Sequence, residues 1–572
     1  MKHRILRSTM VNAVIACLAT ATVMVNQTGY LPTANKEFFT TTAADSFHIV
    51  SFGTSAIVYR GAISISKTND GASGTTVYRG DFTEFSREGM YSIITSAHDT
   101  SEPFLIDEQV FNPVAAKALK GFYYQRCGMA LTSSYAGLYA HPACHMNDGI
   151  FHRTTDTTGK KVSIGGWHDA GDYGKYIVNA GISVATLLMA YESFPSKFSS
   201  DRTDIPESGN GIPDILDESR YEIRWMMTMQ HWNGGVYCKL TREQFSRFMM
   251  PQKDTTTRYL YRISSAATGD FAAVCARAAR IFAPFDKQFA DSCLHAARSA
   301  WEYLHAHPRI VPERGFRNPD GTATGEYGDR VDSDERLWAA TELYATTGEE
   351  EYNTYFLQHT PAPAIVRSMS WSNVQTMANL TYLFSSNSPM SPIMDTLRAS
   401  LLSYAAALHV KIAQDGFHVA IQPGEYRWGS NSEVLNRAIL LIYAFEVDHD
   451  PAFLTDARSQ LNYILGCNIN DICFVTGIGT NHVMHPHHRP SASDGIAEPV
   501  PGLMAGGPNQ FLQDSVLQSR YTFSTPAARC YIDHRESYAS NEIAINWNAP
   551  LVFVAGYFAD DSAADRTRER QR

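Results

Sequence analysis

Two aspartates three residues apart are the first candidates for chemistry. Asp169 and Asp172 lie in the segment GGWHDAGDYGKY, residues 165–176. Two carboxylates this close repel each other, so as a pair they suit the binding of a cation or the orientation of one water molecule. The glycines around them let backbone and substrate approach closely. The alternative is structural: either aspartate is also a suitable cap for a helix that begins near Tyr173.

A third carboxylate, Glu542, lies near the end of the chain, in the segment YIDHRESYASNEIAINWNAP, residues 531–550. It stands between Asn541 and an apolar segment with helical character. Burial there would raise the pKa of the carboxyl group and make it a general acid. The alternative is an exposed glutamate beside a capped helix.

A segment with four histidines, GIGTNHVMHPHHRP at residues 477–490, also contains Arg489. Its irregular spacing suits either metal binding or a sugar pocket lined by hydrogen-bond donors. The sequence leaves both open.

Cysteine and histidine ligands cluster in the segment before the aspartate pair. Two thiols and two imidazoles there are enough for a closed tetrahedral zinc site: Cys127, Cys144, His145 and His168. A disulfide between Cys127 and Cys144 is the alternative. The chain has nine cysteines, and Cys467 and Cys473 are a second pair close enough in sequence to be considered.

Two acidic segments offer oxygen ligands suited to Ca²⁺. PESGNGIPDILDE supplies Glu207, Asn210, Asp214 and Asp217, and an acid-rich helix start is the alternative there. TGEYGDRVDSDE supplies Thr324, Glu326 and Asp329, but Arg330 stands where a further acid would help.

The elements that must position these residues divide the chain in two. Residues 22–108 contain short runs of β-branched and aromatic residues separated by turn-forming clusters, which predicts an immunoglobulin-like β-sandwich. Residues 109–558 contain many segments with apolar residues at helical spacing, several of them apolar on nearly every side. This predicts an all-α domain, and a toroid of helical hairpins and a plain bundle fit the periodicity equally. Residues 559–572 form a polar tail.

The first 21 residues read as an export signal. A basic start precedes an apolar run, residues 10–21, that is too short to span a bilayer. Cleavage after Ala21 is expected, while Cys17 in VIAC resembles the lipidated residue of a bacterial lipoprotein. The protein is therefore expected to be secreted or periplasmic, or an outer-membrane lipoprotein anchored at Cys17. A net charge of −10 with mixed signs argues against nucleic acid as a partner.

Three motifs in order resemble glycoside hydrolase family 9, the group of cellulases and related β-glucanases. WHDAGDYGKY resembles the family's hallmark segment, and the segment from Tyr531 to Ala549 resembles its C-terminal signature at every fixed position. The segment from Thr476 to Arg489 resembles its histidine signature, departing at Cys473, where Ser, Thr or Val is expected. VNQTGYLP and DFTEFSREGMY resemble the immunoglobulin-like domain that precedes the catalytic domain in one branch.

The resemblance implies an (α/α)6 toroid and a reaction that inverts the anomeric carbon. Asp172 would be the general base that takes a proton from water, Asp169 would help to hold that water, and Glu542 would be the general acid. The two catalytic carboxyls of inverting enzymes stand about 6.5–9.5 Å apart to admit the water. His487 and Arg489 would bind sugar, and Tyr538 and Trp547 are candidates for the walls of the cleft.

Family members with the immunoglobulin-like domain carry structural zinc at the Cys/His pattern and calcium at the first acidic segment, so both ions are expected here. The expected activity is endo-β-1,4-glucanase. Exo-acting cellodextrinase, cellobiohydrolase and β-glucosaminidase are the alternatives on the same scaffold, and Cys238, where relatives often have His, leaves the substrate preference open. A non-catalytic glycan-binding protein is disfavoured because all three acids are present. The tail leaves no room for a cellulose-binding module, which favours soluble or amorphous β-1,4-glucan as substrate.

Overall fold

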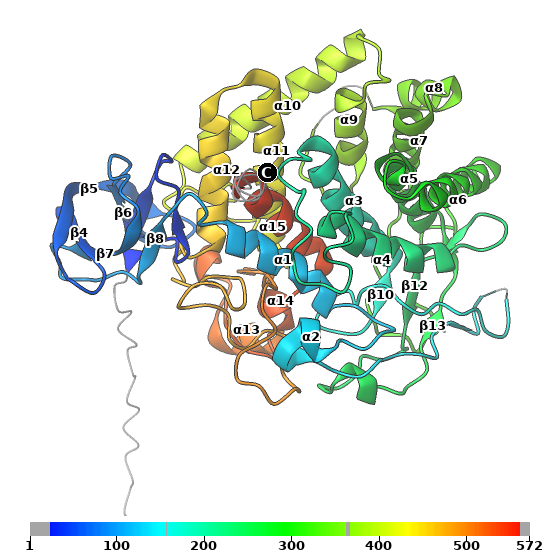
Figure 1. Ribbon diagram of the computed structural model, residues 1–572, viewed down its shortest axis with the longest axis horizontal. Coiled ribbons are helices and arrows are strands. Elements are labelled where there is room, and N and C mark those ends of the chain that lie inside the picture. Colours follow the sequence, from blue (N-terminus) through cyan, green and yellow to red (C-terminus); the bar gives the residue numbers. More distant parts are fainter. Residues whose placement is uncertain (1–22, 156, 362–365, 561–572) are drawn as a thin grey trace, which may run out of the picture.

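The computed structural model describes residues 23–155, 157–361 and 366–560. A strand-rich domain lies beside a larger helical domain, as Figure 1 shows. The predicted signal segment with Cys17 and nearly all of the polar tail lie outside the described residues. No helix in the described ranges is long and apolar enough to cross a membrane.

The N-terminal domain is the predicted immunoglobulin-like sandwich. The eight strands found from residue 23 onward are hydrogen-bonded in the order β1-β3-β6-β5-β4-β7-β8-β2. The first part of β5 pairs with β4 and its second part with β6, so this one strand belongs to both halves of the domain. Aromatic rings fill the core. The rings of Phe38 and Phe47 pack edge to face, with their centroids 4.9 Å apart. The strands are β1 (Val23–Met24), β2 (Gly29–Tyr30), β3 (Glu37–Thr40), β4 (Ser46–Ser51), β5 (Ile57–Asp70), β6 (Thr75–Asp81), β7 (Gly89–Thr95) and β8 (Phe104–Ile106).

In the described part of the helical domain, six helices form the inner ring. They are buried on nearly every side and pack in the sequence α15, α3, α5, α7, α9, with α11 against α15. This agrees with the expected toroid and with the apolar character of these segments. The inner helices are α3 (Ile177–Ser193), α5 (Ser265–Phe282), α7 (Ser333–Thr347), α9 (Gln375–Phe384), α11 (Ser430–Asp448) and α15 (Ile545–Phe558).

The outer helices bury one face each against this ring. They are α1 (Asn112–Tyr124), α4 (Asp214–Thr228), α6 (Lys287–Ala306), α8 (Glu350–His359), α10 (Pro392–Ala413) and α12 (Pro451–Ile464). The sequence analysis did not identify α8 and α9, which are ten residues each. Helices this short are marginal alone, and both pack against α7.

Short elements occupy one end of the ring. Two small sheets contain β9 (Ile150–Phe151), β10 (Lys175–Tyr176), β11 (Val236–Tyr237), β12 (Lys239–Thr241), β13 (Tyr259–Leu260) and β14 (Ile263–Ser264). The short helices are α2 (Ser133–Ala136), α13 (Ser515–Arg520) and α14 (Tyr538–Asn541). The long loops between these elements hold the candidate site.

The two domains share an apolar contact. Met24, Phe39 and Val77 of the sandwich pack with Phe417 and Cys467 of the helical domain. Polar bonds surround this cluster: the side chains of Asn26 and Asn462 are 2.8 Å apart, and the Gln27 amide donates to the Leu465 carbonyl at 2.9 Å.

Candidate active site

The aspartate pair lies in a tight loop immediately before β10 and α3. Helix α3 begins at Ile177, and its N-cap residue, Tyr176, makes no side-chain cap. The helix-cap interpretation of the pair is therefore wrong. Asp172 accepts a hydrogen bond from the Gly174 amide at 2.9 Å. Asp169 accepts one from the Asn179 amide group and one from the Tyr327 hydroxyl, both at 2.9 Å.

Glu542 lies in the three-residue connection between α14 and α15, in extended conformation. It is partly buried, so the exposed-glutamate interpretation is also wrong. Backbone pairing joins this connection to the aspartate loop: Ala544 pairs with Ala170, and the Ile545 amide donates to the Asp169 carbonyl at 2.8 Å. The main chain thus holds the three acids in one place.

The histidine-rich segment completes this arrangement. His487 pairs with Glu542 through the backbone, and the Arg489 amide donates to the Gly171 carbonyl at 3.0 Å. The contact at Gly171 is so close that a Cβ there would lie 1.8 Å from the His487 carbonyl oxygen. Three stretches far apart in sequence therefore meet as adjacent backbone segments.

Burial and the nearby charge of Asp172 raise the pKa of the other two acids, Asp169 and Glu542. Burial, with a smaller contribution from Asp172, raises the pKa of Asp169 to about 8. Burial and the negative charge of Asp172 raise the pKa of Glu542 well above its usual range, against the opposing charge of Arg489. The raised pKa favours the protonated form of Glu542, which is the form that a general acid requires.

Of the predicted sugar-binding residues, His487 and Arg489 are the most firmly fixed. The His487 Nδ1 lies 2.6 Å from the Arg535 carbonyl oxygen, which leaves Nε2 on the other side of the ring. The buried Arg489 guanidinium donates to the carbonyls of Gly171 at 2.7 Å and Ser246 at 3.0 Å.

A row of rings extends from this point. Trp428 contacts Tyr538 at 5.3 Å, Tyr538 contacts His487 at 6.0 Å, and His487 contacts Phe248 at 5.3 Å between ring centroids. Trp428 is 40% and Tyr538 39% exposed, so the row offers open ring faces. The sequence analysis missed Trp428 and Phe248, because nothing in their local sequence shows that they meet rings more than a hundred residues away.

Trp547 lies behind this row, half-buried in the first turn of α15. A Cβ at Gly429 would stand 2.8 Å from its indole nitrogen, and one at Gly506 would stand 2.9 Å from its ring. The indole therefore packs against the backbone that carries Trp428.

The four predicted Cys and His ligands come together in a buried cluster. One ligand atom from each of Cys127, Cys144, His145 and His168 lies within 4.8 Å of all the others. All eight cysteines of the described ranges are free, so the disulfide alternatives are wrong for both pairs considered. Burial alone would raise the pKa of Cys127, but the Cys144 thiol and the charge of Lys175 hold it well below its usual range. These four donors could hold a metal ion, and His168 joins the cluster directly to the aspartate loop.

The first acidic segment is arranged less compactly. Asn210 donates to Asp217 at 3.0 Å, and Ser208 donates to Asp214 at 3.0 Å. Glu207 instead pairs with the buried guanidinium of Arg126 at 2.9 Å.

Thr324 and Glu326 of the second acidic segment, and Cys238, also have defined surroundings in the structure. In the second acidic segment, Thr324 is buried, with its hydroxyl 2.9 Å from that of Thr241, and Glu326 accepts from the Asn318 amide at 3.0 Å. Cys238 is buried in the core, and burial raises the pKa of its thiol to about 12.

Family models match both parts of the chain. Residues 111–555 match the model described as glycosyl hydrolase family 9, and residues 19–100 match that of the cellulase N-terminal ig-like domain. Among characterised relatives, Endoglucanase D of Acetivibrio thermocellus is 35% identical over 95% of this chain and 81% of its own length. The xyloglucan-specific endo-beta-1,4-glucanase of Bacteroides ovatus is 38% identical over 83% of each chain. The cellodextrinase of Butyrivibrio fibrisolvens is 34% identical over 93% of this chain and 98% of its own.

Solved structures agree across the whole molecule. A metagenome-derived family 9 endoglucanase superposes with a TM-score of 0.88 at 36% identity, covering 94% of this chain and 99% of its own. A Zn-binding triple mutant of the family 9 endoglucanase J30 also gives 0.88, at 33% identity, covering 93% of this chain and 100% of its own.

Proposed function

The chain belongs to glycosyl hydrolase family 9, and we propose that it is an endo-β-1,4-glucanase that hydrolyses cellulose-like glucans with inversion. The single observation that carries the proposal is the meeting of Asp169, Asp172 and Glu542 on adjacent backbone segments, where burial raises the pKa of Glu542.

In this mechanism Asp172 removes a proton from the attacking water, and Asp169 helps to orient that water. Glu542 gives its proton to the glycosidic oxygen of the leaving sugar while the water oxygen bonds to the anomeric carbon and the glycosidic bond breaks. At the end of this single step Glu542 is a carboxylate and Asp172 is protonated. His487 Nε2 and the guanidinium of Arg489 bind sugar hydroxyls beside the cleaved bond. The rings of Tyr538 and Trp428 bind sugar faces, while Trp547 supports them from behind.

Product analysis tests the activity and its mode. On carboxymethylcellulose and cellohexaose, we expect a rapid fall in viscosity and mixed oligosaccharides. Glu542→Gln should lose about 10²–10⁴-fold in kcat, because an amide cannot donate the acid's proton. A single short product without loss of viscosity would instead indicate an exo-acting enzyme such as a cellodextrinase. Absence of hydrolysis of any β-1,4-glucan or chitosan oligomer by the wild type would leave a glycan-binding protein.

We also propose that the Cys/His cluster holds structural zinc. Two thiols and two imidazoles fit the tetrahedral preference of Zn²⁺, and their burial and proximity suit a closed site. When bound, zinc links the loop of Cys127 and Cys144 to the aspartate loop through His168.

Calcium is proposed at the first acidic segment, through Glu207, Asn210, Asp214 and Asp217, with the contact between Asn210 and Asp217 as support. Elemental analysis of the purified protein, which the experiment below also requires, tests whether zinc and calcium are bound. Export through the N-terminal signal, with cleavage or lipidation at Cys17, is proposed on the sequence of the first 21 residues.

A further inference from the structure

The two ring nitrogens of His145 face different groups. Nδ1 faces the Cys/His cluster, and Nε2 faces a carboxylate. Its Nδ1 lies 3.7 Å from the Cys127 sulfur and 3.2 Å from the His168 Nε2. Its Nε2 lies 3.8 Å from the Oδ2 of Asp254. Both of these atoms are buried, and neither has a hydrogen-bond partner in the structure. Two orphaned polar atoms thus face each other on the side of the ring away from the cluster.

The chemistry of a metal-bound imidazole explains this arrangement. A metal at Nδ1 requires the ring proton to be on Nε2, and that N–H then needs an acceptor. The Asp254 side chain is only 1% exposed, so water does not take this role easily. A carboxylate acceptor fixes both the tautomer and the orientation of such a ring.

The second oxygen of Asp254 has a different partner, an arginine that lines the pocket at Asp172. It accepts a hydrogen bond from the Arg242 Nη1 at 2.9 Å. Arg242 begins the segment 242–246, which we call the cleft wall. Arg242, Phe245 and Ser246 of this wall line a small pocket together with Asp172. One buried carboxylate therefore contacts both the metal cluster and the wall beside the catalytic base.

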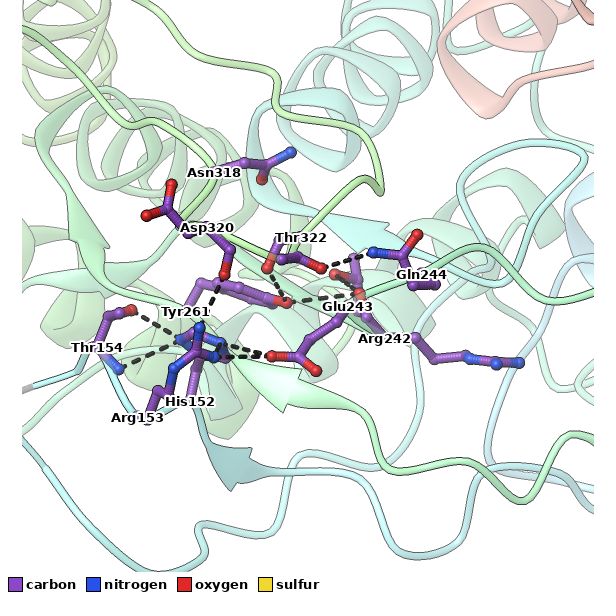
Figure 2. A network of polar contacts seen from close by, with 12 residues as sticks. His152, Arg153, Thr154, Arg242, Glu243, Gln244, Tyr261, Asn318, Asp320 and Thr322 are labelled. Atoms are coloured by element: carbon purple, nitrogen blue, oxygen red, sulfur yellow. Dashed lines mark hydrogen bonds and ion pairs between the residues drawn. The ribbon is translucent and has the colours of Figure 1, made fainter.

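A separate polar network holds the other side of the cleft wall, as Figure 2 shows. Glu243 accepts from Arg153 at 2.9 Å, and Gln244 donates to the Gly321 carbonyl at 2.6 Å. The ring of His152 stacks on that of Tyr261, with the ring centroids 4.6 Å apart. In the same view the Arg242 side chain extends away from this network. Glu243 and Asp254 are thus two carboxylates that each pair with one arginine and one histidine, and of the two it is Asp254 that faces the metal cluster.

We propose that Asp254 is a positioning residue that couples the metal cluster to the cleft wall. It orients His145 for the metal through one oxygen and fixes Arg242 at the start of the wall through the other. The inference rests on a metal at the Cys/His cluster, as proposed above, and adds the residue through which that metal affects the substrate cleft.

The test compares Asp254→Asn with Glu243→Gln, because Glu243 lies on the cleft wall and also pairs with one arginine and one histidine. Zinc affinity of the full chain is measured by competition with a chromogenic chelator, and KM is measured on cellohexaose with zinc in excess. Asp254→Asn should weaken zinc binding by about 10–100-fold, the usual effect of losing the partner of a ligating histidine. Glu243→Gln should keep the wild-type zinc affinity. Both variants loosen the wall and should raise KM.

Each other outcome has a definite meaning. Unchanged zinc affinity in Asp254→Asn, or an equal loss in Glu243→Gln, would overturn the role of Asp254. Weaker zinc binding with an unchanged KM would overturn the coupling to the wall. A wild-type protein that binds no zinc would remove the metal proposal itself and this inference with it. Should Asp254→Asn fail to fold, Asp254→Glu replaces it, and faster release of zinc to the chelator is then the expected result.

Discussion

At the scale of single residues, the surroundings of Asp169 and Glu542 determine how readily each carboxyl group loses its proton. Asp169 is buried with an amide and a hydroxyl as partners, and its pKa is about 8. Glu542 has its pKa raised by burial and by the charge of Asp172. A carboxyl group held neutral in the folded protein makes folding depend on pH in a defined direction.

Asp169→Asn should therefore change how stability varies with pH. The pKa of Asp169 is raised from 3.8 to about 8, so the unfolded chain releases this proton first, and stability is lost as pH rises across that interval. The asparagine variant has no proton to lose at this position. The melting temperature of the variant minus that of the wild type should therefore rise from pH 4 to pH 8 and stay constant above pH 8. The slope difference is at most about 1.4 kcal/mol per pH unit.

Asp320→Asn is the control, because the Asp320 side chain is exposed. A difference between wild type and Asp169→Asn that stays constant from pH 4 to 8 would show that Asp169 is ionised throughout this range.

The sequence showed which residues could meet, but not what surrounds them. The three acids that it singled out lie on adjacent backbone segments, and the four Cys and His residues that the family resemblance suggested lie together, while their catalytic and metal-binding roles stay predictions. Local sequence could not exclude the helix cap, because that depends on where α3 begins. It could not place Arg126 on Glu207, 81 residues away, or Asp254 on His145, since these contacts arise only from the fold.

At the scale of elements, the site depends on short backbone pairings between loops. The aspartate loop, the connection before α15 and the histidine-rich segment are joined by main-chain bonds. Helix α15 starts directly after the paired residue Ala544, and α3 follows the aspartate loop after β10. Two helices of the inner ring therefore adjoin the paired loops.

Gly171→Ala should disrupt this arrangement. A Cβ at Gly171 would lie 1.8 Å from the His487 carbonyl oxygen, so the two segments must move apart. Since a displacement of about 1 Å can cost 10²-fold in rate, we expect kcat/KM on cellohexaose to fall by about that factor. Gly71→Ala is the control, because its nearest neighbour would be 4.0 Å away. A Gly171→Ala enzyme with wild-type kcat/KM would mean that the pairing does not set the catalytic geometry.

At the scale of the whole molecule, the sandwich covers apolar surface of the helical domain. Phe417 is buried against Phe39 and Val77 of the sandwich, so either domain alone would expose apolar side chains to water. Removing residues 22–108 should therefore lower the melting temperature, by exposing this patch.

Phe417→Ala tests the same contact without a deletion. Loss of a buried phenylalanine costs about 3–5 kcal/mol in the free energy of unfolding, measured by denaturant titration. Phe523→Ala, at a side chain that is 83% exposed, should change the free energy of unfolding by no more than about 0.5 kcal/mol. Equal effects of the two substitutions would argue against a stabilising domain contact.

The backbone pairing of Glu542 with His487, and of Ala544 with Ala170, also has a consequence for how this enzyme can diversify. The distance between acid and base is set by peptide groups, which every amino acid carries. Substitutions in the outer helices or in the row of rings can accumulate over generations without altering that distance. New glucans can thus be accommodated at Trp428, Tyr538 or the cleft wall, while the chemistry itself is inherited unchanged.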